Sequence, residues 1–465
     1  MHLNRTWFTL SCVIGASLFW SACKSDKLDS GEAHNQALPS YPQRAGDSAA
    51  GLEYLLYGDY LGSGIPTEIF RRYFGNDNRN LLNREGDSAT IPSAFTLFEA
   101  PNGVEVVGGI NCFGCHASYV NGTYMVGVGN AFSDFTEDST SLYQGVSGII
   151  GAEYGYESPE WEAFKHLGQA ATVIGPQIVT PFAGVNPAFA LEEAAVSRRD
   201  PETLLWQEDV VFDVSNAPLA SDVPPWWHVQ KKNALYYNAV GRGDMAKLIM
   251  QICVVGVWDA DHAAQIETHF PDVLAYLNSL EPPPYPEAID VSLSRSGEDI
   301  FNAQCSACHG TYGENESYPN LLIPLDVVGT DPAIARYYID EPAFLEWLQA
   351  SWFAGGEYPA VFEGEPGYIA PPLDGIWATA PYFHNGSVPN LAAVLDSSLR
   401  PNLWTRDFGS SELDFELMGW PYSELDEGTA TYNTQLTGYG NQGHTFGDSL
   451  SDAERSALLE YLKTL

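Results

Sequence analysis

The sequence predicts a mainly α-helical protein with long loop insertions, little β structure and two domains that share one local motif. A Cys-X-X-Cys-His pattern occurs twice, at Cys112–His116 and at Cys305–His309. Short amphipathic patterns open or close each half of the chain, and glycine-rich stretches separate them. The proline run EPPPYP at 281–286 is typical of a stiff linker and marks the predicted domain boundary.

The repeated motif predicts covalently bound haem. Two thiols three residues apart can add to the two vinyl groups of one porphyrin, while the histidine that follows reaches the iron as proximal ligand. A four-ligand zinc site is disfavoured because neither motif has a second cysteine pair beside it. Two c-type haems are therefore expected in two cytochrome c-like domains. Their attachment residues are Cys112, Cys115, Cys305 and Cys308, and their proximal ligands are His116 and His309.

The composition limits the classes of partner. With 60 acidic and 21 basic residues the formal net charge is −39, which excludes nucleic acid and an anionic membrane surface as partners. A basic redox partner protein, adaptation to a saline medium, or a solvated acidic surface without specific meaning would each suit this charge. Cys253 lies in the apolar run 248–257, which is too short to span a bilayer and indicates a buried core thiol.

Residues 1–23 predict export from the cytoplasm. Arg5 precedes the mostly apolar stretch 10–19, and small residues lead to Cys23, as in a bacterial lipoprotein signal. Trp20 departs from that pattern, and an ordinary secretory signal is the alternative. We expect a periplasmic or cell-surface protein, joined to a bacterial membrane only through a lipid on Cys23. Residues 24–50 are polar and predict a flexible tether.

The N-terminal haem domain is predicted over residues 51–280. A short helix is expected at 51–57, a hairpin or bulged loop at 121–135, and a closing amphipathic helix at 271–280. The stretch 224–244 is dense in aromatic residues and contains several of the scarce basic ones. It predicts either core packing or a haem pocket whose cations meet the propionates. The candidates for such a pocket are Trp226, Trp227, Tyr236 and Tyr237.

The C-terminal cytochrome c domain is predicted over residues 287–465. A short helix at 296–304 leads into the second motif. A capping box at Ser451–Glu454 begins the last helix, which carries leucines on one side. First and last helices packed across each other are what a cytochrome c fold requires.

Several longer segments resemble a known family. The segment 370–391, which contains APYFHNG, is similar to the C-terminal domain of the bacterial di-haem cytochrome c peroxidase superfamily. The PPWW stretch at 224–227 and the segments 127–134 and 443–447 look more specifically like the branch of di-haem rubber oxygenases and peroxidase-like relatives. The resemblance implies two facing cytochrome c domains, with one iron for chemistry and one for electron transfer. Calcium between the domains is a further candidate cofactor.

The second ligand of the C-terminal haem departs from the peroxidase pattern. In that superfamily a methionine normally follows the His-Asn-Gly segment, but residues 392–400 contain none. Met418 has neighbours that favour a structural role. His444 lies in the glycine-rich loop 438–447, and the oxygenase branch has its ligand histidine in a similar loop. We therefore expect His309 and His444 to bind the second iron from both sides. The alternative ligand, His384, is expected instead to contact the pocket or a propionate.

A bis-histidine iron transfers electrons, so the reactive site falls to the first haem, with His116 as its proximal ligand. A peroxidase also needs an acid–base group near that iron. His166, His228 and glutamates of the first domain are candidates, and the sequence does not select among them. The resemblance also allows one of the two adjacent tryptophans to relay electrons between the haems.

The predicted function is that of a peroxidase-like oxidoreductase, with hydrogen peroxide as oxidant. The alternative is a dioxygenase of the rubber-oxygenase type, which uses oxygen to cleave carbon–carbon double bonds. A non-enzymatic di-haem electron carrier would need a further first-domain ligand, for which Met125, His166 and His228 are the options. A maturation enzyme that oxidises a partner protein is disfavoured, because that branch uses a tyrosine ligand where this chain has His444.

Overall fold

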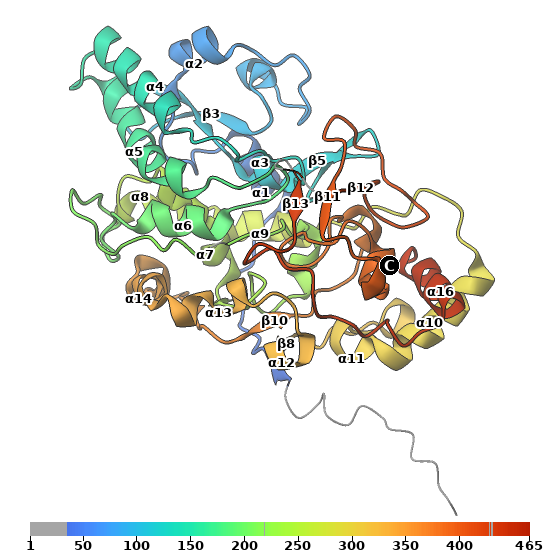
Figure 1. The fold of residues 1–465 in the computed structure, drawn as a ribbon. Helices are drawn as coiled ribbons and strands as arrows, with labels where there is room; N and C mark the ends of the chain where they lie inside the picture. Colours follow the sequence, from blue (N-terminus) through green and yellow to red (C-terminus); the bar gives the residue numbers. More distant parts are fainter. Residues whose placement is uncertain (1–34, 218, 427, 429–430) are drawn as a thin grey trace, which may run out of the picture. The chain divides into compact units, whose positions relative to one another are not determined.

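The protein is described here by a computed structural model of residues 35–465, apart from residues 218, 427, 429 and 430. Helices predominate, and the β structure of the described residues forms small antiparallel sheets (Figure 1), which confirms the predicted mainly α class. The expected export signal, Cys23 and residues 24–34 of the expected tether lie outside the described residues. Residues Asn35–Leu465 form one unit, and their division into two domains stays a prediction.

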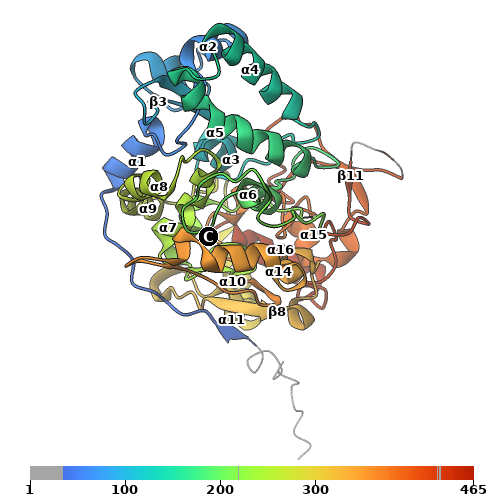
Figure 2. The same cartoon turned by 90° about the vertical axis from the view of Figure 1, so that its left-hand side faces the viewer.

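Helices of the first half surround the first motif. Helices α4 and α5 lie side by side at the top of both views (Figures 1 and 2). The expected helix at 51–57 begins earlier, because the Asp47 side chain accepts hydrogen bonds from the amides of Ala49 and Ala50. The helices are α1 (Ser48–Tyr57), α2 (Thr67–Phe74), α3 (Cys112–His116), α4 (Thr140–Glu153), α5 (Pro159–Ile174), α6 (Ala188–Val196), α7 (Met245–Ile249), α8 (Ala260–Glu267) and α9 (Phe270–Asn278), with 3-10 turns η1 (Gly86–Thr90), η2 (Gly175–Gln177), η3 (Trp226–Lys231) and η4 (Met250–Val255).

Helices of the second half surround the second motif. The Asp290 side chain caps the first of them, and the predicted capping box of Ser451 and Glu454 is confirmed at the start of the last. The helices are α10 (Val291–Gln304), α11 (Ser306–His309), α12 (Leu325–Val328), α13 (Ala333–Asp340), α14 (Pro342–Ala350), α15 (Leu391–Leu395) and α16 (Asp452–Leu462), with 3-10 turns η5 (Gly313–Asn315), η6 (Trp352–Ala354), η7 (Ile376–Ala378) and η8 (Ser397–Leu399).

The first and last helices of this half cross each other, as predicted. The rings of Phe301 in α10 and Tyr461 in α16 lie 5.3 Å apart. Gly297 lies against the backbone at the crossing, because a Cβ atom there would lie 2.0 Å from the carbonyl oxygen of Ala457. The crossing fixes the direction from which α10 reaches Cys305.

The strands pair in antiparallel ladders that connect distant parts of the sequence. Strand β7 pairs with β9, and β1 pairs with β8, so pairing crosses the predicted linker at 281–286. The hairpin or bulged loop expected at 121–135 is a hairpin that begins earlier, since β5 (Ala117–Val120) precedes that stretch and pairs with β6 (Thr123–Val126). The sheets are ordered β1-β8-β10, β12-β11-β13, β2-β4-β3, β5-β6 and β7-β9. The strands are β1 (Gln36–Ala37), β2 (Ile65–Pro66), β3 (Phe95–Glu99), β4 (Glu105–Gly109), β5 (Ala117–Val120), β6 (Thr123–Val126), β7 (Gly241–Gly243), β8 (Leu321–Pro324), β9 (Ala360–Phe362), β10 (Gly367–Ile369), β11 (Leu403–Thr405), β12 (Ser423–Glu424) and β13 (Tyr432–Asn433).

Residues 35–50 correct the expectation of a flexible tether. Gln36 and Ala37 form β1 against β8, and the side chain of Leu38 is buried. Arg44 makes ion pairs with Asp244 at 2.7 Å and with Glu267 at 3.0 Å. The segment is thus anchored to the body at β1, Leu38 and Arg44 although most of its residues are exposed, and a sequence pattern does not reveal these contacts.

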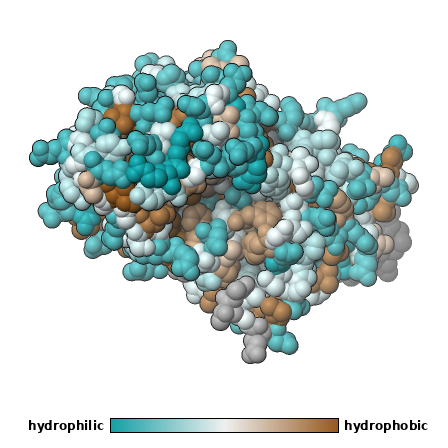
Figure 3. Space-filling view, turned by 90° about the horizontal axis from the view of Figure 1, so that it is seen from above, coloured by the Kyte–Doolittle hydropathy of each residue, from teal (hydrophilic) through white to brown (hydrophobic). Residues whose placement is uncertain are grey.

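The core is continuous across the two predicted halves. One large cluster of buried side chains includes Phe113 beside the first motif, Trp226, and Tyr368 of the second half. Cys253 is buried in this cluster, which confirms its predicted role as a core thiol. On the face seen in Figure 3, hydrophilic residues cover most of the surface, and hydrophobic ones gather near its centre, where the surface is hollowed. None of the described helices has both the length and the apolar composition that crossing a membrane would require.

Candidate functional site

The second motif holds its histidine in the form that binds metals. Nδ1 of His309 lies 2.8 Å from the carbonyl oxygen of Pro371. A carbonyl oxygen only accepts hydrogen bonds, so Nδ1 carries the proton and Nε2 keeps its lone pair. Burial lowers the pKa of His309, which keeps the imidazole neutral. A hydrogen bond of this kind orients a ligand histidine and raises its basicity.

His444 lies at the distance from His309 that a shared iron requires. The centres of the two rings are 6.2 Å apart. Bonds from a metal ion to imidazole nitrogen are about 2 Å long, so an iron bound between two imidazoles places their ring centres about 6 Å apart. Burial lowers the pKa of His444 to about 3, so this imidazole is also neutral. The geometry fits a bis-histidine haem iron.

The loop that carries His444 lies close to another segment of backbone. The amide of His444 donates a hydrogen bond of 2.6 Å to the carbonyl oxygen of Val328. A Cβ atom at Gly443 would lie 2.1 Å from the carbonyl carbon of Gly329, and Gly443 has a φ of 76°. Only glycine allows both the close approach and this φ. The close backbone contact and the positive φ therefore explain why the sequence around His444 is rich in glycine.

A cavity of about 240 Å³ with mainly apolar walls adjoins these two histidines. Cys305 and Cys308 line it together with His309, so the motif faces a hollow suited to a flat apolar cofactor. Lys232 also lines the cavity, and burial lowers the pKa of its ammonium to about 8. An ammonium in apolar surroundings fits the carboxylate of a haem propionate. The donor set of this cavity therefore fits a c-type haem.

His384 lines the same cavity, but its Nε2 atom has a different partner. Tyr368 donates its hydroxyl proton to the carbonyl oxygen of Asp331 at 2.6 Å. Nε2 of His384 lies 3.0 Å from that same hydroxyl oxygen and must therefore donate its own proton to it. The two rings also stack, with their centres 4.1 Å apart. This arrangement supports the expected pocket role of His384 and leaves its Nε2 without a lone pair for iron.

The first motif is held by two asparagines. The Asn111 side chain accepts a hydrogen bond from the amide of Gly114 and caps helix α3. Asn130 donates from its backbone to the carbonyl oxygen of Cys115 and from its side chain to that of Gly114, both at 2.8 Å. These bonds fix the five residues of the motif on the hairpin that follows them.

The groups of the first motif are buried and neutral. Burial raises the pKa of Cys112 to about 12 and that of Cys115 to about 11, so both are thiols rather than thiolates. Burial lowers the pKa of His116 to about 4, against the opposing effect of the Pro224 carbonyl. Neutral thiols beside a neutral imidazole are compatible with thioether attachment of a porphyrin.

The four aromatic candidates do not share one pocket, which corrects the expectation that they all wall the first haem. Trp226 contacts the first motif, since its ring stacks on His116 with centres 5.1 Å apart. Trp227 packs in the cluster around the second motif and donates from Nε1 to the carbonyl oxygen of Asp374 at 2.8 Å. Both belong to η3, and successive side chains of a 3-10 helix point about 120° apart.

Tyr236 and Tyr237 also diverge. Tyr237 lines the cavity at the second motif. Tyr236 has a φ of 64° and turns its hydroxyl to Glu192 of α6 and to Gln251 of η4. A left-handed backbone at a bulky residue is strained and persists only when the surrounding structure holds it.

The histidines named as acid–base candidates lie elsewhere. Nε2 of His228 lies 2.9 Å from the Asp374 carbonyl oxygen, and His228 lines the cavity at the second motif. His166 stacks on Trp258, with ring centres 5.1 Å apart. Met125 lies in β6, opposite Ser118 of β5.

A carboxylic acid that the sequence did not select lies in the core of the first half. The Tyr236 oxygen is 2.7 Å from Oε1 of Gln251 and 3.1 Å from Oε1 of Glu192. Its single proton can satisfy one of these two acceptors, and the shorter bond is to Gln251. Glu192 is therefore satisfied when it carries a proton itself. Burial raises the pKa of Glu192 to about 7, in agreement.

Glu192 belongs to the same part of the core as the first motif. Gln251 lies two residues before Cys253, whose pKa is raised by burial and further by the nearby Cys112 thiol. Phe189, one turn before Glu192, packs at a tilt against Tyr236 with ring centres 5.7 Å apart. A glutamate within a helix gave no pattern to single it out, because its partners come from residues 44 and 59 positions away.

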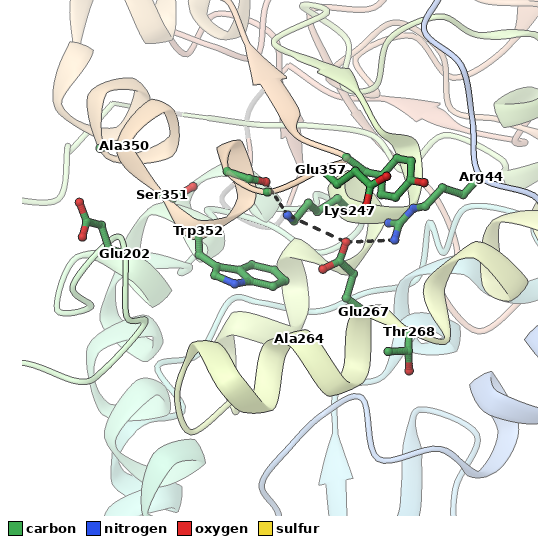
Figure 4. Close-up of a pocket in the computed structure, with 13 residues that line it drawn as sticks. Arg44, Glu202, Lys247, Ala264, Glu267, Thr268, Ala350, Ser351, Trp352 and Glu357 are labelled. Carbon is green, nitrogen blue, oxygen red and sulfur yellow. Dashed lines mark hydrogen bonds and ion pairs between the residues drawn. The ribbon is translucent and has the colours of Figure 1, made fainter.

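A larger pocket of about 530 Å³ lies on the surface, away from both motifs (Figure 4). Its two basic side chains, Arg44 and Lys247, already have partners. Lys247 donates to the carbonyl oxygen of Gly355 at 2.8 Å and lies over the ring of Trp352, and Glu267 pairs with Arg44. Elsewhere in the described residues, no three His, Cys, Asp or Glu side chains gather into a metal site, and calcium stays a prediction.

Comparison with known proteins relates the second half to a haem protein family. Residues 367–405 match a family described as RoxA-like, cytochrome c-like. This segment contains Tyr368, His384 and part of the cavity wall. The cytochrome c-like match implies a haem cofactor and supports a relationship to RoxA-like di-haem cytochromes.

Two proteins of Sinorhizobium fredii, the uncharacterized proteins y4iJ and y4iM, are similar over longer stretches. Identity to y4iJ is 30% over 250 residues, which cover 40% of this chain and 41% of that protein. Identity to y4iM is 26% over 290 residues, which cover 52% of this chain and 64% of that protein. The chain thus matches less than two thirds of the length of either relative.

Proposed function

We propose that this chain is a di-haem c-type oxidoreductase that reduces hydrogen peroxide. In this proposal the second haem, attached at Cys305 and Cys308, is held by His309 and His444 and transfers electrons. The first haem, attached at Cys112 and Cys115 with His116 as ligand, is where peroxide reacts. The observation that carries the proposal is the 6.2 Å separation of the His309 and His444 rings.

The two haems would have different roles because they differ in the number of histidine ligands. A haem iron with imidazole on both faces exchanges electrons but has no free position for a substrate. His228 lines the cavity at the second motif and His166 stacks on Trp258, and among the described residues no second imidazole ring pairs with His116 as His444 does with His309. That asymmetry supports a reactive first haem and an electron-transferring second one.

Reduction of one peroxide molecule to two of water consumes two electrons and two protons. Haem iron supplies the redox chemistry when it is bound, and the protein must supply and move the protons. With its pKa raised to about 7, the Glu192 carboxyl can hold or release a proton near neutral pH, and its bond to Tyr236 orients it. A protonated carboxyl in the core beside the first motif supports peroxide chemistry there.

The tryptophan pair offers a route between the two sites. Trp226 stacks on His116, and the adjacent Trp227 donates to the Asp374 carbonyl, which is also in contact with His228 of the second cavity. Pro224 and Pro225, immediately before the pair, line that cavity. We propose that this stretch relays electrons between the two haems. The sequence alone did not decide which of the two tryptophans takes part.

The second candidate function is a dioxygenase that cleaves carbon–carbon double bonds. It is favoured by the RoxA-like match at residues 367–405. It is favoured as well by the apolar cluster that surrounds Phe113 and Trp226, since a dry site suits bound oxygen. The two functions need different reactants at the same first haem.

Replacing His444 with alanine tests the division of roles. We expect the H444A protein to lose the low-spin absorption of the second haem, because one of two strong ligands is gone. Added imidazole should restore the low-spin spectrum. The matched control is His384→Ala in the same cavity, which should stay low spin. An unchanged spectrum in the H444A protein would sink the ligand assignment.

Turnover assays separate the two candidate functions. The purified protein is supplied either with peroxide and a reduced cytochrome c or with oxygen and polyisoprene. We expect oxidation of the cytochrome in the first assay and no cleavage product in the second. Carbon monoxide binding to the reduced protein is measured beside them, and binding to neither haem would indicate an electron carrier instead.

The cellular setting is also part of the proposal. We propose a periplasmic or cell-surface protein that is anchored through a lipid on Cys23 and receives electrons from a redox partner protein. Labelling of the expressed chain with a radioactive fatty acid tests the anchor. Cys23→Ser should abolish the label, and an unlabelled wild-type protein would contradict the lipoprotein assignment.

A further inference from the structure

Arg406 is a buried cation that makes no ion pair within the described residues, although the charge of the adjacent Asp407 favours its charged form. Its side chain is 9% exposed, and its Nη1 atom is buried with no hydrogen-bond partner. Its Nη2 atom donates to the carbonyl oxygen of Ala131. Within the described residues, no carboxylate lies within ion-pair distance of this guanidinium.

Aromatic rings surround the charge but do not neutralise it. The guanidinium carbon lies 4.0 Å from the ring centre of Trp420 and 4.4 Å from those of Phe132 and Phe408. Such contacts stabilise a buried cation by less than its burial costs. Burial lowers the pKa of Arg406 to about 9. A buried guanidinium in this position is stabilised when an anionic group pairs with it.

The position of Arg406 indicates which anion that is. Ala131 and Phe132 directly follow Asn130, which is hydrogen-bonded to the backbone of Gly114 and Cys115 in the first motif. Arg406 also lines a small cavity of about 20 Å³ together with Pro381, and Pro381 lines the large cavity at the second motif. The guanidinium is thus in direct contact with the segment tied to the first motif, and its small cavity shares Pro381 with the cavity at the second.

We propose that Arg406 binds a propionate carboxylate of the first haem. This inference rests on the proposed attachment of a haem at Cys112 and Cys115. Each haem brings two carboxylates, and the cavity of the second motif already has an ammonium in Lys232. Planar recognition of a carboxylate by two N–H groups is the contact that arginine forms best. The C-terminal half of the chain would then set the charge around the haem of the N-terminal half.

The test is a redox titration of each haem in variants of Arg406. Removing a positive charge beside a haem favours its oxidised form, so R406M should lower the reduction potential of the first haem and leave that of the bis-histidine haem unchanged. R406K keeps the charge but not the planar fork, and its shift should be smaller. Arg336→Met, which removes an exposed arginine paired with Asp340, is the control and should shift neither potential.

Two further measurements make the outcome unambiguous. Haem content per chain is determined by the pyridine haemochrome method, and one haem per wild-type chain would defeat the proposed function rather than this inference. With two haems present, an unshifted first potential in both R406M and R406K overturns the role of Arg406. Should R406M fail to fold, R406K alone decides, through the haem propionate vibrations in resonance Raman spectra. A first-haem potential that depends on chloride in the wild type would indicate a small inorganic anion instead, and would also overturn the proposal.

Discussion

Three residues at the proposed sites have a strained backbone conformation. His444, Phe383 and Tyr236 all have positive φ, at 45°, 70° and 64°, although none is glycine. Phe383 lines the cavity at the second motif, and its ring centre is 5.9 Å from that of His444. Each such residue costs roughly 1 to 3 kcal/mol, which the surrounding structure must offset. The left-handed backbone orients each of these side chains so that its ring faces its partner.

Glu192 should make stability depend on pH. Its pKa is raised from 4.5 to about 7 in the folded chain. The folded chain therefore keeps a proton that the unfolded chain releases, so the free energy of unfolding falls as pH rises from about 4.5 to 7 and is constant above that. At about 1.4 kcal/mol for each pKa unit the loss is about 3 kcal/mol. Urea unfolding of the wild type at pH 5 and pH 8 measures it.

Glu192→Gln should remove this part of the pH dependence, since the amide does not titrate. The exposed Glu53→Gln is the matched control and should retain the wild-type difference between the two pH values. Equal pH dependence in the Glu192→Gln protein and the wild type would show that the carboxyl does not hold its proton in the fold.

Among the helices, α10 and α16 determine how the second motif is presented. Their crossing is close because Gly297 lies against the carbonyl oxygen of Ala457. Phe301 and Tyr461 pack beside the contact, and Leu458 and Leu462 of α16 line the cavity where His309 lies. The helix pair thus supplies both the anchor of the motif and part of the cavity wall.

Gly297→Ala should force the two helices apart. The added methyl group would lie 2.0 Å from backbone that has no room to shift, so we expect a loss of roughly 1 to 3 kcal/mol in the free energy of unfolding. Thermal unfolding followed by circular dichroism measures it. The control is Gly145→Ala in α4, where nothing lies within 4 Å of the added atom. There we expect a gain of about 0.5 to 1 kcal/mol from helix propensity. A stable Gly297→Ala protein would contradict the close crossing.

The molecule as a whole carries a net charge of −39. Such a charge produces a negative potential over the surface, which attracts cationic proteins and repels anionic ones. The described structure also joins the two motifs into one unit, through strand pairs and a core that cross the proline linker. Electrons that enter at one motif therefore have a protein path to the other.

Reduction by a partner protein should depend on salt in a direction set by the charge of the partner. With a basic cytochrome c, we expect the second-order rate of electron transfer to fall severalfold as ionic strength rises from about 0.01 M to about 0.15 M, because screening removes the attraction. With an acidic donor the rate should rise over the same range. Stopped-flow absorbance measures both, and a rate with the basic donor that does not change with salt would contradict electrostatic steering.

The sequence by itself determined what is local. The two Cys-X-X-Cys-His motifs, the capping box at Ser451, the hairpin after the first motif and the helices beside the second depend on residues within one or two turns of each other. Covalent haem chemistry and hydrogen bonds to helix ends have fixed spacings, so a pattern suffices to predict them. His444 is an intermediate case, because its role was predicted partly from its glycine-rich loop and partly from the resemblance to the rubber-oxygenase branch.

Only the tertiary structure decided which side chains meet across the chain. It separated Trp226 from Trp227 and Tyr236 from Tyr237, although each pair is adjacent in sequence. It joined Glu192 to Tyr236 and placed Arg406 beside Ala131, 275 residues away. It also packed residues 35–50 onto the body. The physical reason is that burial and partner choice depend on how distant backbones approach one another, and composition and spacing do not encode that approach locally.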